Sequence, residues 1–208
     1  MAVPFFLKHT KLSCFVFNAP KTIFSHIVEK FIRCRAQFIY STITPFLRGN
    51  KILDIGMGPG GLTCWLLCHG YQVQGIDVKN LSVYQDVQPT LYNGTQIPFH
   101  DKAFDTALLI HVLHHTSDPI AILREAQRVG KQVICIEDTY RTKIERLFVA
   151  LNDMLGNFEF CVHEYKMRHE WKQIIAEHRW KLVYYKEWSK LFPPGGFGYG
   201  RYIMFVIE

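Results

Sequence analysis

The glycine-rich segment "KILDIGMGPGGLT", residues 51–63, is the first stretch of the chain whose residues could hold a ligand. Glycine lacks Cβ and tolerates positive φ, so the backbone of this segment can approach a bound molecule closely. The spacing Gly-x-Gly-x-x-Gly, formed by Gly56, Gly58 and Gly61, is typical of dinucleotide-binding loops. The segment also fits an Asp-x-Gly-x-Gly-x-Gly pattern, which starts at Asp54 and ends at Gly60. The glycines alone leave open which adenosine-bearing cofactor the loop would hold.

Two acids narrow the choice of cofactor. Asp54 stands at a position that is normally apolar in the dinucleotide fingerprint, because it ends a buried strand. A buried carboxylate is costly unless a partner satisfies it. The positively charged amino-acid end of S-adenosylmethionine offers such a partner, whereas a pyrophosphate would be repelled. Asp77 ends the next apolar run, "YQVQGID", where an acid accepts hydrogen bonds from the ribose of either cofactor.

Three histidines in "LLIHVLHHTSDP" follow a third apolar run and could take part in proton transfer. His114 and His115 fall where the predicted strand opens toward the cofactor. A histidine there could accept a proton from a hydroxyl or an acidic carbon, because it titrates near neutral pH. That this pair only shapes the cofactor pocket is an equally good interpretation. We place His111 within the strand, where we expect a packed, hydrogen-bonded side chain beside the cofactor.

Further candidates stand near the end of the fourth apolar run and before a late helix. Glu137 and Asp138 could bind a substrate amine or act as a base, or Asp138 could cap the helix that follows. His163 and Tyr165 in "CVHEYKM" precede the late helix, from which side chains could cover a substrate. We therefore treat Asp138, His163 and Tyr165 as candidate substrate contacts.

Short apolar runs that alternate with amphipathic segments must position these residues. Strands are predicted at "KILDI", "YQVQGID", "FDTALLIHV" and "KQVICIE", with a weaker one at "PTLYN". Helices are predicted at "GGLTCWLLCHG" and at "SDPIAILREAQRVG", where Ser117 or Asp118 caps the start and Gly130 follows the end. This rhythm predicts an α/β fold with a Rossmann-like, doubly wound, mostly parallel seven-stranded sheet and helices on both faces.

The two ends of the chain complete that domain. Helices are expected at "RTKIERLFVALNDML" and "MRHEWKQIIAEHR", and "WKLVYYKEW" with "RYIMFVIE" predicts a C-terminal hairpin at the sheet edge. Residues 1–49 contain an amphipathic helix whose apolar positions, among them Ile23, Ile27, Phe31 and Phe38, should pack on the sheet domain. The chain thus divides into a helical cap, 1–49, and a single globular domain, 50–208.

Taken together, four segments resemble the class I S-adenosylmethionine-dependent methyltransferases, in particular the small type 11 group similar to ubiquinone- and menaquinone-biosynthesis C-methyltransferases. They are "ILDIGMGPG" (52–60), "GID" (75–77), "QIPFHDKAFDTALLIHVLHH" (96–115) and "REAQRVGKQVICIE" (124–137). The resemblance implies that the 54–60 loop, with Asp54, Gly56, Met57, Gly58 and Gly60, contacts the methionine end of the cofactor.

The resemblance also assigns the adenosine end. Asp77 is implied to bind the ribose and Val78 to lie near the adenine. The family often carries an acid that contacts adenine N6, and Asn93 stands at the aligned position of this chain. An amide can still hydrogen-bond an adenine edge, and Gly94 and Thr95 beside it could supply backbone donors.

Composition limits what else the chain can be. Its 208 residues, 49% of them hydrophobic, suffice for one substantial core. The net charge of +6 comes from Lys and Arg interleaved with acids, which disfavours a dedicated nucleic-acid surface.

Six scattered cysteines predict reduced thiols and a cytoplasmic location. They predict no metal site, because no second Cys/His pair has ligand spacing. No apolar run is long enough to span a membrane, and peripheral membrane contact stays open, as does the oligomeric state.

The leading hypothesis is an S-adenosylmethionine-dependent enzyme that methylates an oxygen or carbon of a small acceptor. An Asn/Asp-Pro-Pro-aromatic signature of nitrogen-methylating enzymes is absent from the sequence. An RNA or protein methyltransferase is the alternative, followed by a NAD-dependent oxidoreductase and a non-catalytic cofactor-binding protein. The aromatic N-terminus and "FPPGGFGYGRY" could shape an apolar acceptor pocket.

Overall fold

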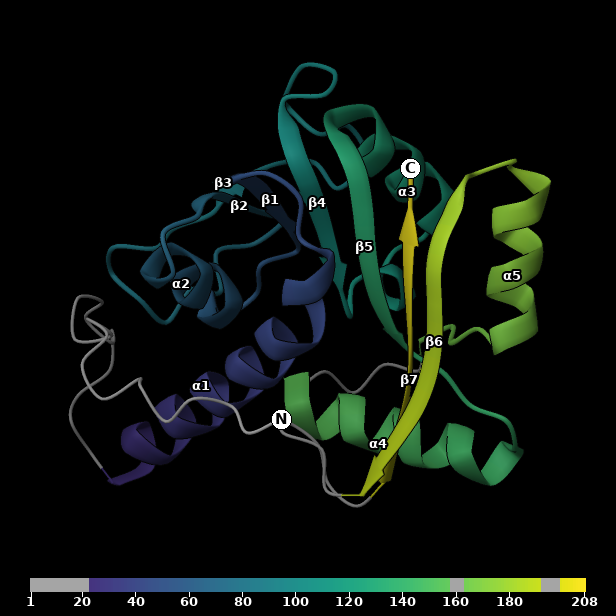
Figure 1. The fold of residues 1–208 in the computed structure, drawn as a ribbon. Coiled ribbons are helices and arrows are strands. Elements are labelled where there is room, and N and C mark those ends of the chain that lie inside the picture. Colours follow the sequence, from purple (N-terminus) through teal and green to yellow (C-terminus); the bar gives the residue numbers. More distant parts are fainter. Residues whose placement is uncertain (1–22, 158–162, 192–198) are drawn as a thin grey trace.

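The computed structural model of the protein describes residues 23–157, 163–191 and 199–208 (Figure 1). The first elements along the chain are α1 (Ile23–Ile43), the 3-10 turn η2 (Thr44–Phe46), β1 (Lys51–Ile55), α2 (Gly61–Cys68) and β2 (Gln72–Asp77). Then follow β3 (Thr90–Leu91), β4 (Phe104–Ile110), η3 (Leu113–His115), α3 (Pro119–Val129), β5 (Gly130–Asp138), α4 (Lys143–Asn157), α5 (Arg168–Glu177), β6 (Leu182–Leu191) and β7 (Tyr199–Ile207).

Seven strands form one sheet in the order β3-β2-β1-β4-β5-β7-β6. The five strands from β3 to β5 are parallel, whereas β7 runs antiparallel to both β5 and β6. The predicted mostly parallel sheet and its C-terminal edge hairpin are thereby confirmed. The weak strand expected at "PTLYN" is reduced to the two residues of β3. The sheet order changes direction between β1 and β4, so a crevice is expected at the carboxyl ends of these two strands.

Helices cover both faces of the sheet because the strands are apolar on both sides. In β5, Val133 and Cys135 join the core cluster that contains α3 and α5, whereas Ile134 and Ile136 join the one that contains α1 and α2. Helix α3 begins as predicted: the Asp118 carboxylate accepts the backbone N–H of Ala121 at 2.9 Å. The period-2 alternation of β5 therefore fixes which helix lies on which face.

The α1 helix packs on the sheet domain only in part through the expected face. Phe38 packs against the core as expected, and Ala36, Ile39 and Ile43 are buried, whereas Ile27 and Phe31 are exposed. The helix contacts α2, where Ile32 and Ala36 lie against Gly61 (Figure 1). Within the predicted cap, residues 1–22 lie outside the described residues, as does the segment 192–198 between β6 and β7.

Helix α4 lies across the carboxyl ends of the central strands (Figure 1). Arg201 of β7 holds it there through an ion pair with Glu145 at 2.8 Å, and Asn152 donates to the Tyr199 carbonyl at 3.0 Å. The hydroxyl of Thr142 accepts the backbone N–H of Glu145, and α4 begins at Lys143, so the alternative that Asp138 or Thr139 caps this helix does not hold. This placement carries the end of α4 over the site described next.

Candidate functional site

The glycine loop leaves β1 in a conformation that only glycine adopts without strain. Gly56, Gly58 and Gly60 have φ of 69°, 52° and 81°. A Cβ at Gly56 would meet Val112 Cγ2 at 2.6 Å, so the loop packs against the segment after β4. A Cβ at Gly58 would meet no protein atom within 4 Å. The loop is therefore tight on the side of β4 and open at Gly58, where a ligand can reach the backbone.

Asp54 is buried, as the sequence predicted, but it has a partner within the chain. Its carboxylate accepts the hydroxyl of Thr63 at 2.6 Å, and both residues are 2% exposed. Burial raises the pKa of Asp54 to about 6, the Asp77 charge adds to the rise, and the Thr63 bond opposes it. The sequence argument missed Thr63, since a threonine in the first turn of a helix has no distinctive signal.

The Asp77 carboxylate, 8% exposed, supports the glycine loop. One oxygen accepts the backbone N–H of Gly58 at 2.9 Å, and the other accepts that of Lys79 at 3.2 Å. Each carboxylate oxygen can accept a second hydrogen bond. Asp77 can therefore hold the loop and still accept from a ligand hydroxyl.

The loop at Asn93 is a self-contained turn beside Val78. The Asn93 side-chain oxygen accepts the backbone N–H groups of Thr95 and Gln96, both at 3.0 Å. Gly94 has φ of 77°, and a Cβ there would lie 3.1 Å from Val78, which is 53% exposed. The Thr95 N–H thus already donates to Asn93 within the turn. The amide nitrogen of Asn93 makes no bond in this turn, so it is the group that can donate to a ligand.

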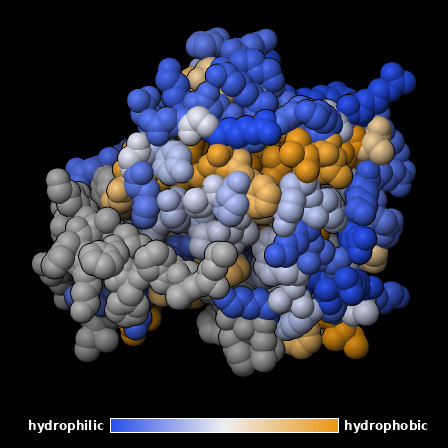
Figure 2. Space-filling model, viewed as in Figure 1, coloured by the Kyte–Doolittle hydropathy of each residue, from blue (hydrophilic) through white to orange (hydrophobic). Residues whose placement is uncertain are grey.

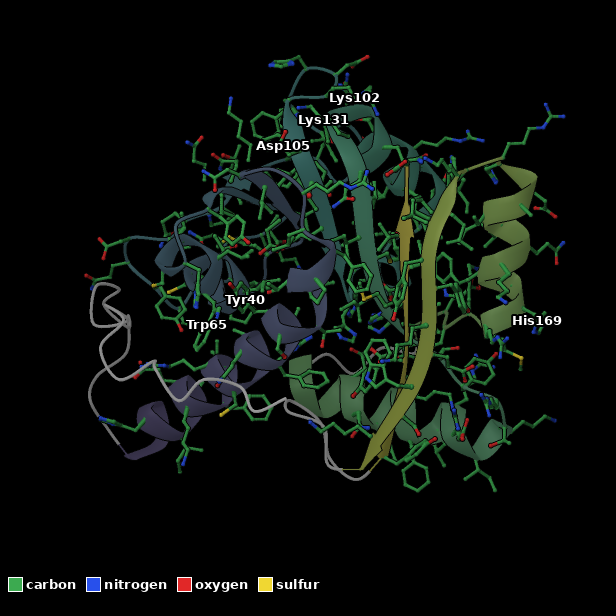
Figure 3. All side chains as sticks on the ribbon, viewed as in Figure 1. Tyr40, Trp65, Lys102, Asp105, Lys131 and His169 are labelled. Carbon is green, nitrogen blue, oxygen red and sulfur yellow. The ribbon has the colours of Figure 1, made fainter. Side chains whose placement is uncertain are left out.

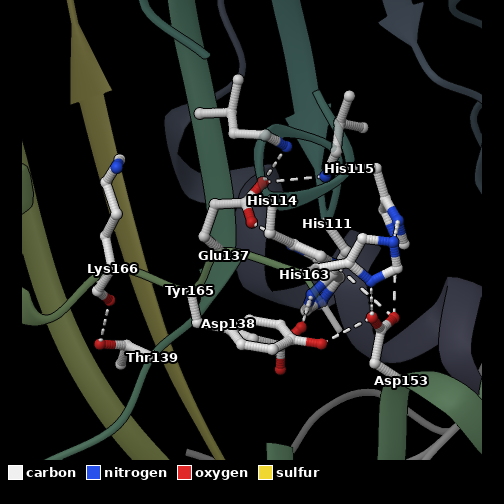
Figure 4. Close-up of polar contacts among 12 residues, drawn as sticks. His111, His114, His115, Glu137, Asp138, Thr139, Asp153, His163, Tyr165 and Lys166 are labelled. Carbon is white, nitrogen blue, oxygen red and sulfur yellow. Dashed lines mark hydrogen bonds and ion pairs between the residues drawn. The ribbon is translucent and has the colours of Figure 1, made fainter. Parts of the chain in front are cut away.

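The histidines after β4 meet residues from β5, α4 and the segment before α5 (Figure 4). His114 Nδ1 lies 2.6 Å from Oε2 of Glu137, whose other oxygen accepts the N–H groups of Val112 and Leu113. On the other side of the ring, His114 Nε2 lies 3.6 Å from Oδ1 of Asp153. The buried His114 imidazole thus lies between two carboxylates.

Asp153 links the remaining members. Its Oδ2 accepts the hydroxyl of Tyr165 and lies 2.7 Å from His163 Nδ1. His163 Nε2 lies 3.2 Å from His115 Nδ1, and His115 Nε2 lies 3.6 Å from Asp153 Oδ1. We call His114, His115, Asp153, His163 and Tyr165 the histidine cluster. Four of these residues were predicted as candidates from the sequence. The fifth, Asp153, was not, because its segment has the pattern of an ordinary amphipathic helix.

Charge is distributed unevenly within the histidine cluster. Burial alone would lower the pKa of His114, but Glu137 and Asp153 together raise it to about 10. Burial and the neighbouring His114 lower the pKa of His115 to about 4. Burial would raise the pKa of Asp153, but bonds from His114 and Tyr165 hold it below its usual range. The raised pKa therefore favours a positive charge on the His114 imidazole, which its two neighbouring carboxylates stabilise.

His111 and Asp138 form a separate pair. β4 ends at Ile110, one residue before His111, so the prediction that His111 lies within the strand was wrong. Its backbone has φ of 56°, which turns the ring toward Asp138 Oδ2, 2.7 Å away, with Tyr202 packed edge-on. Burial would raise the pKa of Asp138, but His111 lowers it. Asp138 is thus occupied by His111 and not by the histidine cluster.

The glycine loop and the histidine cluster adjoin each other. Gly56 packs on Val112, whose N–H bonds Glu137, and Glu137 in turn holds His114. Both regions lie at the carboxyl ends of the parallel strands. A cofactor at the loop and an acceptor at the cluster could therefore meet.

Comparisons with known proteins match this region of the chain. Residues 53–133 match the family model described as a methyltransferase domain. Two curated relatives are a demethylmenaquinone methyltransferase of Tropheryma whipplei, 33% identical over 42% of this chain and 41% of the relative, and a ubiquinone biosynthesis O-methyltransferase of Pseudomonas putida, 27% identical over 41% of each. The chain thus spans about two fifths of the length of these relatives.

A solved structure extends the likeness beyond the matched segment. The magnesium protoporphyrin IX methyltransferase of Synechocystis PCC 6803, solved with bound SAH, has a TM-score of 0.60 and 18% identity, over 91% of this chain and 89% of that one. At this level of identity the likeness shows the fold alone, a Rossmann-like α/β fold with a seven-stranded sheet.

Proposed function

We propose that the chain is an S-adenosylmethionine-dependent methyltransferase acting on an oxygen or carbon of a small, apolar acceptor, on the premise that residues 53–133 match the methyltransferase domain model. The observation that carries the proposal is the junction through Gly56 and Val112, which sets the glycine loop against the residues that hold His114. Named relatives that act in menaquinone and ubiquinone biosynthesis support a small acceptor.

The residues at the loop fit the proposed cofactor. The open side of Gly58 admits a ligand against the backbone, and Asp77 keeps acceptor capacity for a ribose. We assign Asp54, Met57 and the loop glycines to the methionine end, and Val78, Asn93, Gly94 and Thr95 to the surroundings of the adenine. His111, fixed by Asp138, would line the pocket between the two regions. The bound cofactor supplies a methyl group already activated by its sulfonium.

The chain must then orient the acceptor and take up its proton. We assign this to the histidine cluster, with His114 and His115 nearest the reacting atoms and Asp138, His163 and Tyr165 around the acceptor. His115 is the exposed member, and its lowered pKa keeps it neutral at pH 7, so its ring can accept a hydrogen bond from the acceptor. Tyr165 and His163 hold Asp153 in place from the other side.

Calorimetry tests the cofactor assignment. S-adenosylhomocysteine should bind and NADH should not, because the Asp54 carboxylate beside the glycine loop repels a pyrophosphate. NADH binding without S-adenosylhomocysteine binding would overturn the proposal in favour of the oxidoreductase.

The acceptor class is tested by tritium transfer from labelled S-adenosylmethionine into cell extract, with nuclease and protease treatments in parallel. Label that survives both treatments and partitions into organic solvent supports a small, apolar acceptor. Label lost to nuclease or to protease would replace it with the alternative, an RNA or protein methyltransferase.

We also propose that α4 touches an anionic membrane surface that would hold such an acceptor. Four of its large apolar side chains, Ile144, Leu147, Phe148 and Leu151, are 43–70% exposed at helical spacing. Exposed Lys143 and Arg146 flank them, and orange surface appears at the lower edge of the molecule, where α4 lies (Figure 2). Such a combination is typical of helices at membrane interfaces. Among the described residues no helix is long and apolar enough to cross a membrane.

Vesicle sedimentation tests this contact. The protein should sediment with vesicles of phosphatidylcholine and phosphatidylglycerol, and Leu147→Glu should weaken sedimentation. Leu182→Glu, an equally apolar exposed site on β6, is the matched control. Equal sedimentation of both variants would remove α4 from the contact.

Two assignments complete the proposal. The buried free thiol of Cys135 supports a reducing, cytoplasmic location. The contact of α1 with α2 supports a division into a helical cap, 1–49, and a catalytic domain, 50–208.

A further inference from the structure

The histidine cluster brings three electron-pair donors together at one point. One ligand atom each from His114, His115 and Asp153 lies within 4.8 Å of the other two. Both imidazole Nε2 atoms lie 3.6 Å from the same oxygen, Oδ1 of Asp153. The His114 Nε2 atom is buried and makes no hydrogen bond among the described residues. A buried nitrogen in this state needs a partner, because its desolvation is otherwise uncompensated.

The hydrogen bonds of His114 determine where its lone pair points. Glu137 binds the N–H groups of Val112 and Leu113 and can only accept, so His114 Nδ1 carries the proton toward it. In the neutral ring, the Nε2 lone pair then faces Asp153.

A second chain of bonds fixes His115 in the same way. Asp153 Oδ2 accepts from His163 Nδ1, which leaves His163 Nε2 as an acceptor. His115 Nδ1 therefore donates to His163, and the His115 Nε2 lone pair also faces Asp153 Oδ1. With both rings neutral, two imidazole lone pairs and a carboxylate oxygen converge at one point, where either a metal ion or a proton on His114 Nε2 would bind.

The surroundings are those of a metal centre. Metal-binding histidines usually donate their second N–H to a carboxylate or to another hydrogen-bond acceptor, which fixes the ring. Glu137 does this for His114 and His163 does it for His115, while Tyr165 holds Asp153. Nitrogen and oxygen ligands about 2.0–2.1 Å from a tetrahedral ion lie about 3.3 Å apart. The two observed nitrogen–oxygen distances of 3.6 Å therefore need to shorten by a few tenths of an ångström, and all three ligand atoms already lie within 4.8 Å of one another.

We propose that His114, His115 and Asp153 bind one divalent transition-metal ion. A set of two imidazoles and one carboxylate suits zinc or iron(II), and does not suit magnesium or calcium, which prefer oxygen ligands. The proposal departs from the prediction of no metal site, which considered ligands close in sequence. Asp153 is 38 residues beyond His115 and meets it only in the fold.

Such an ion would bind an acceptor hydroxyl and ease the loss of its proton. This role rests on the proposed methyl transfer, whereas the binding of the metal does not. Loss of S-adenosylhomocysteine binding would refute the proposed function and leave the metal site untouched.

The experiment measures metal on the full chain, produced without a polyhistidine tag. The apo-protein is loaded with zinc(II) or cobalt(II) chloride, desalted, and analysed by mass spectrometry of the metal and by the visible absorption of cobalt. We expect about one equivalent of metal and a cobalt spectrum typical of low coordination number. His115→Gln and Asp153→Asn should weaken binding tenfold or more.

A matched variant separates the site from ordinary surface histidines. His169 is an exposed residue of α5 (Figure 3) and is not among the three proposed ligands, so His169→Gln should keep full metal content. His115→Gln decides the test if Asp153→Asn fails to fold, because His115 is the exposed member of the set. A wild-type protein without stoichiometric metal, or equal metal in all variants, would overturn the proposal and leave a proton on His114 as the cation.

Discussion

At the β1–β2 end of the sheet, polar side chains bond backbone groups of neighbouring loops, whereas at the β4–β5 end they bond one another across long stretches of chain. Asp77 and Asn93 hold turns in place. His115 meets a partner 48 residues away. In the first region, side chains hold the backbone in a shape that can bind a ligand. The second region is a cluster of ionisable groups that has more hydrogen-bond acceptors than donors. The comparison teaches that binding geometry and proton chemistry are built by different means in this fold.

The strongest way to break the β4–β5 region is to remove the charge at its centre. Glu137→Gln would place an amide N–H₂ either against the two backbone donors or against the donor Nδ1 of His114, and would remove the charge, so we expect a loss of about 3 kcal/mol or more of stability. Urea unfolding measures it. Glu164→Gln, at an exposed position, is the control, and a loss equal to that control would show that Glu137 is dispensable.

A pH series on the cofactor-free protein tests the buried acid of the β1–β2 region. Because the folded pKa of Asp54 is raised to about 6, the native state binds more protons than the unfolded state between the two pKa values. The contribution of Asp54 to stability should therefore fall by about 2 kcal/mol as pH rises from 4 to 7.

Asp54→Asn should remove this slope, since the amide oxygen can still accept from Thr63. Asp101→Asn, 76% exposed in its side chain, should keep it. Parallel wild-type and Asp54→Asn stability curves would contradict the raised pKa.

Asp77→Ala should weaken S-adenosylhomocysteine binding about tenfold or more, on the order of 1.4 kcal/mol. It removes both the ligand acceptor and the bond to Gly58. Calorimetry compares it with Asp101→Ala, which lies in the turn just before the start of β4. Unchanged affinity would exclude Asp77 from the cofactor site.

The smallest effect comes from a pair of glycines. Gly58 and Gly70 both have positive φ and open space around the missing Cβ. Alanine should cost about 1 kcal/mol of stability at each. Only Gly58→Ala should also weaken S-adenosylhomocysteine binding, because a ligand would lie where the new methyl points. Equal affinity of the two variants would place the ligand elsewhere.

The sequence by itself determined the sheet, the capped α3, the buried Asp54 and the position of Asp77, because these depend on periodicity and on signals a few residues apart. It also singled out His114, His115, His163 and Tyr165, though not as one cluster. Only the tertiary structure decided that Asp153 joins them, that Thr63 satisfies Asp54 and that Asp138 pairs with His111. Those contacts join residues that are far apart in the chain and belong to different strands and helices. Composition and spacing do not predict them, because the packing of the elements decides which side chains meet.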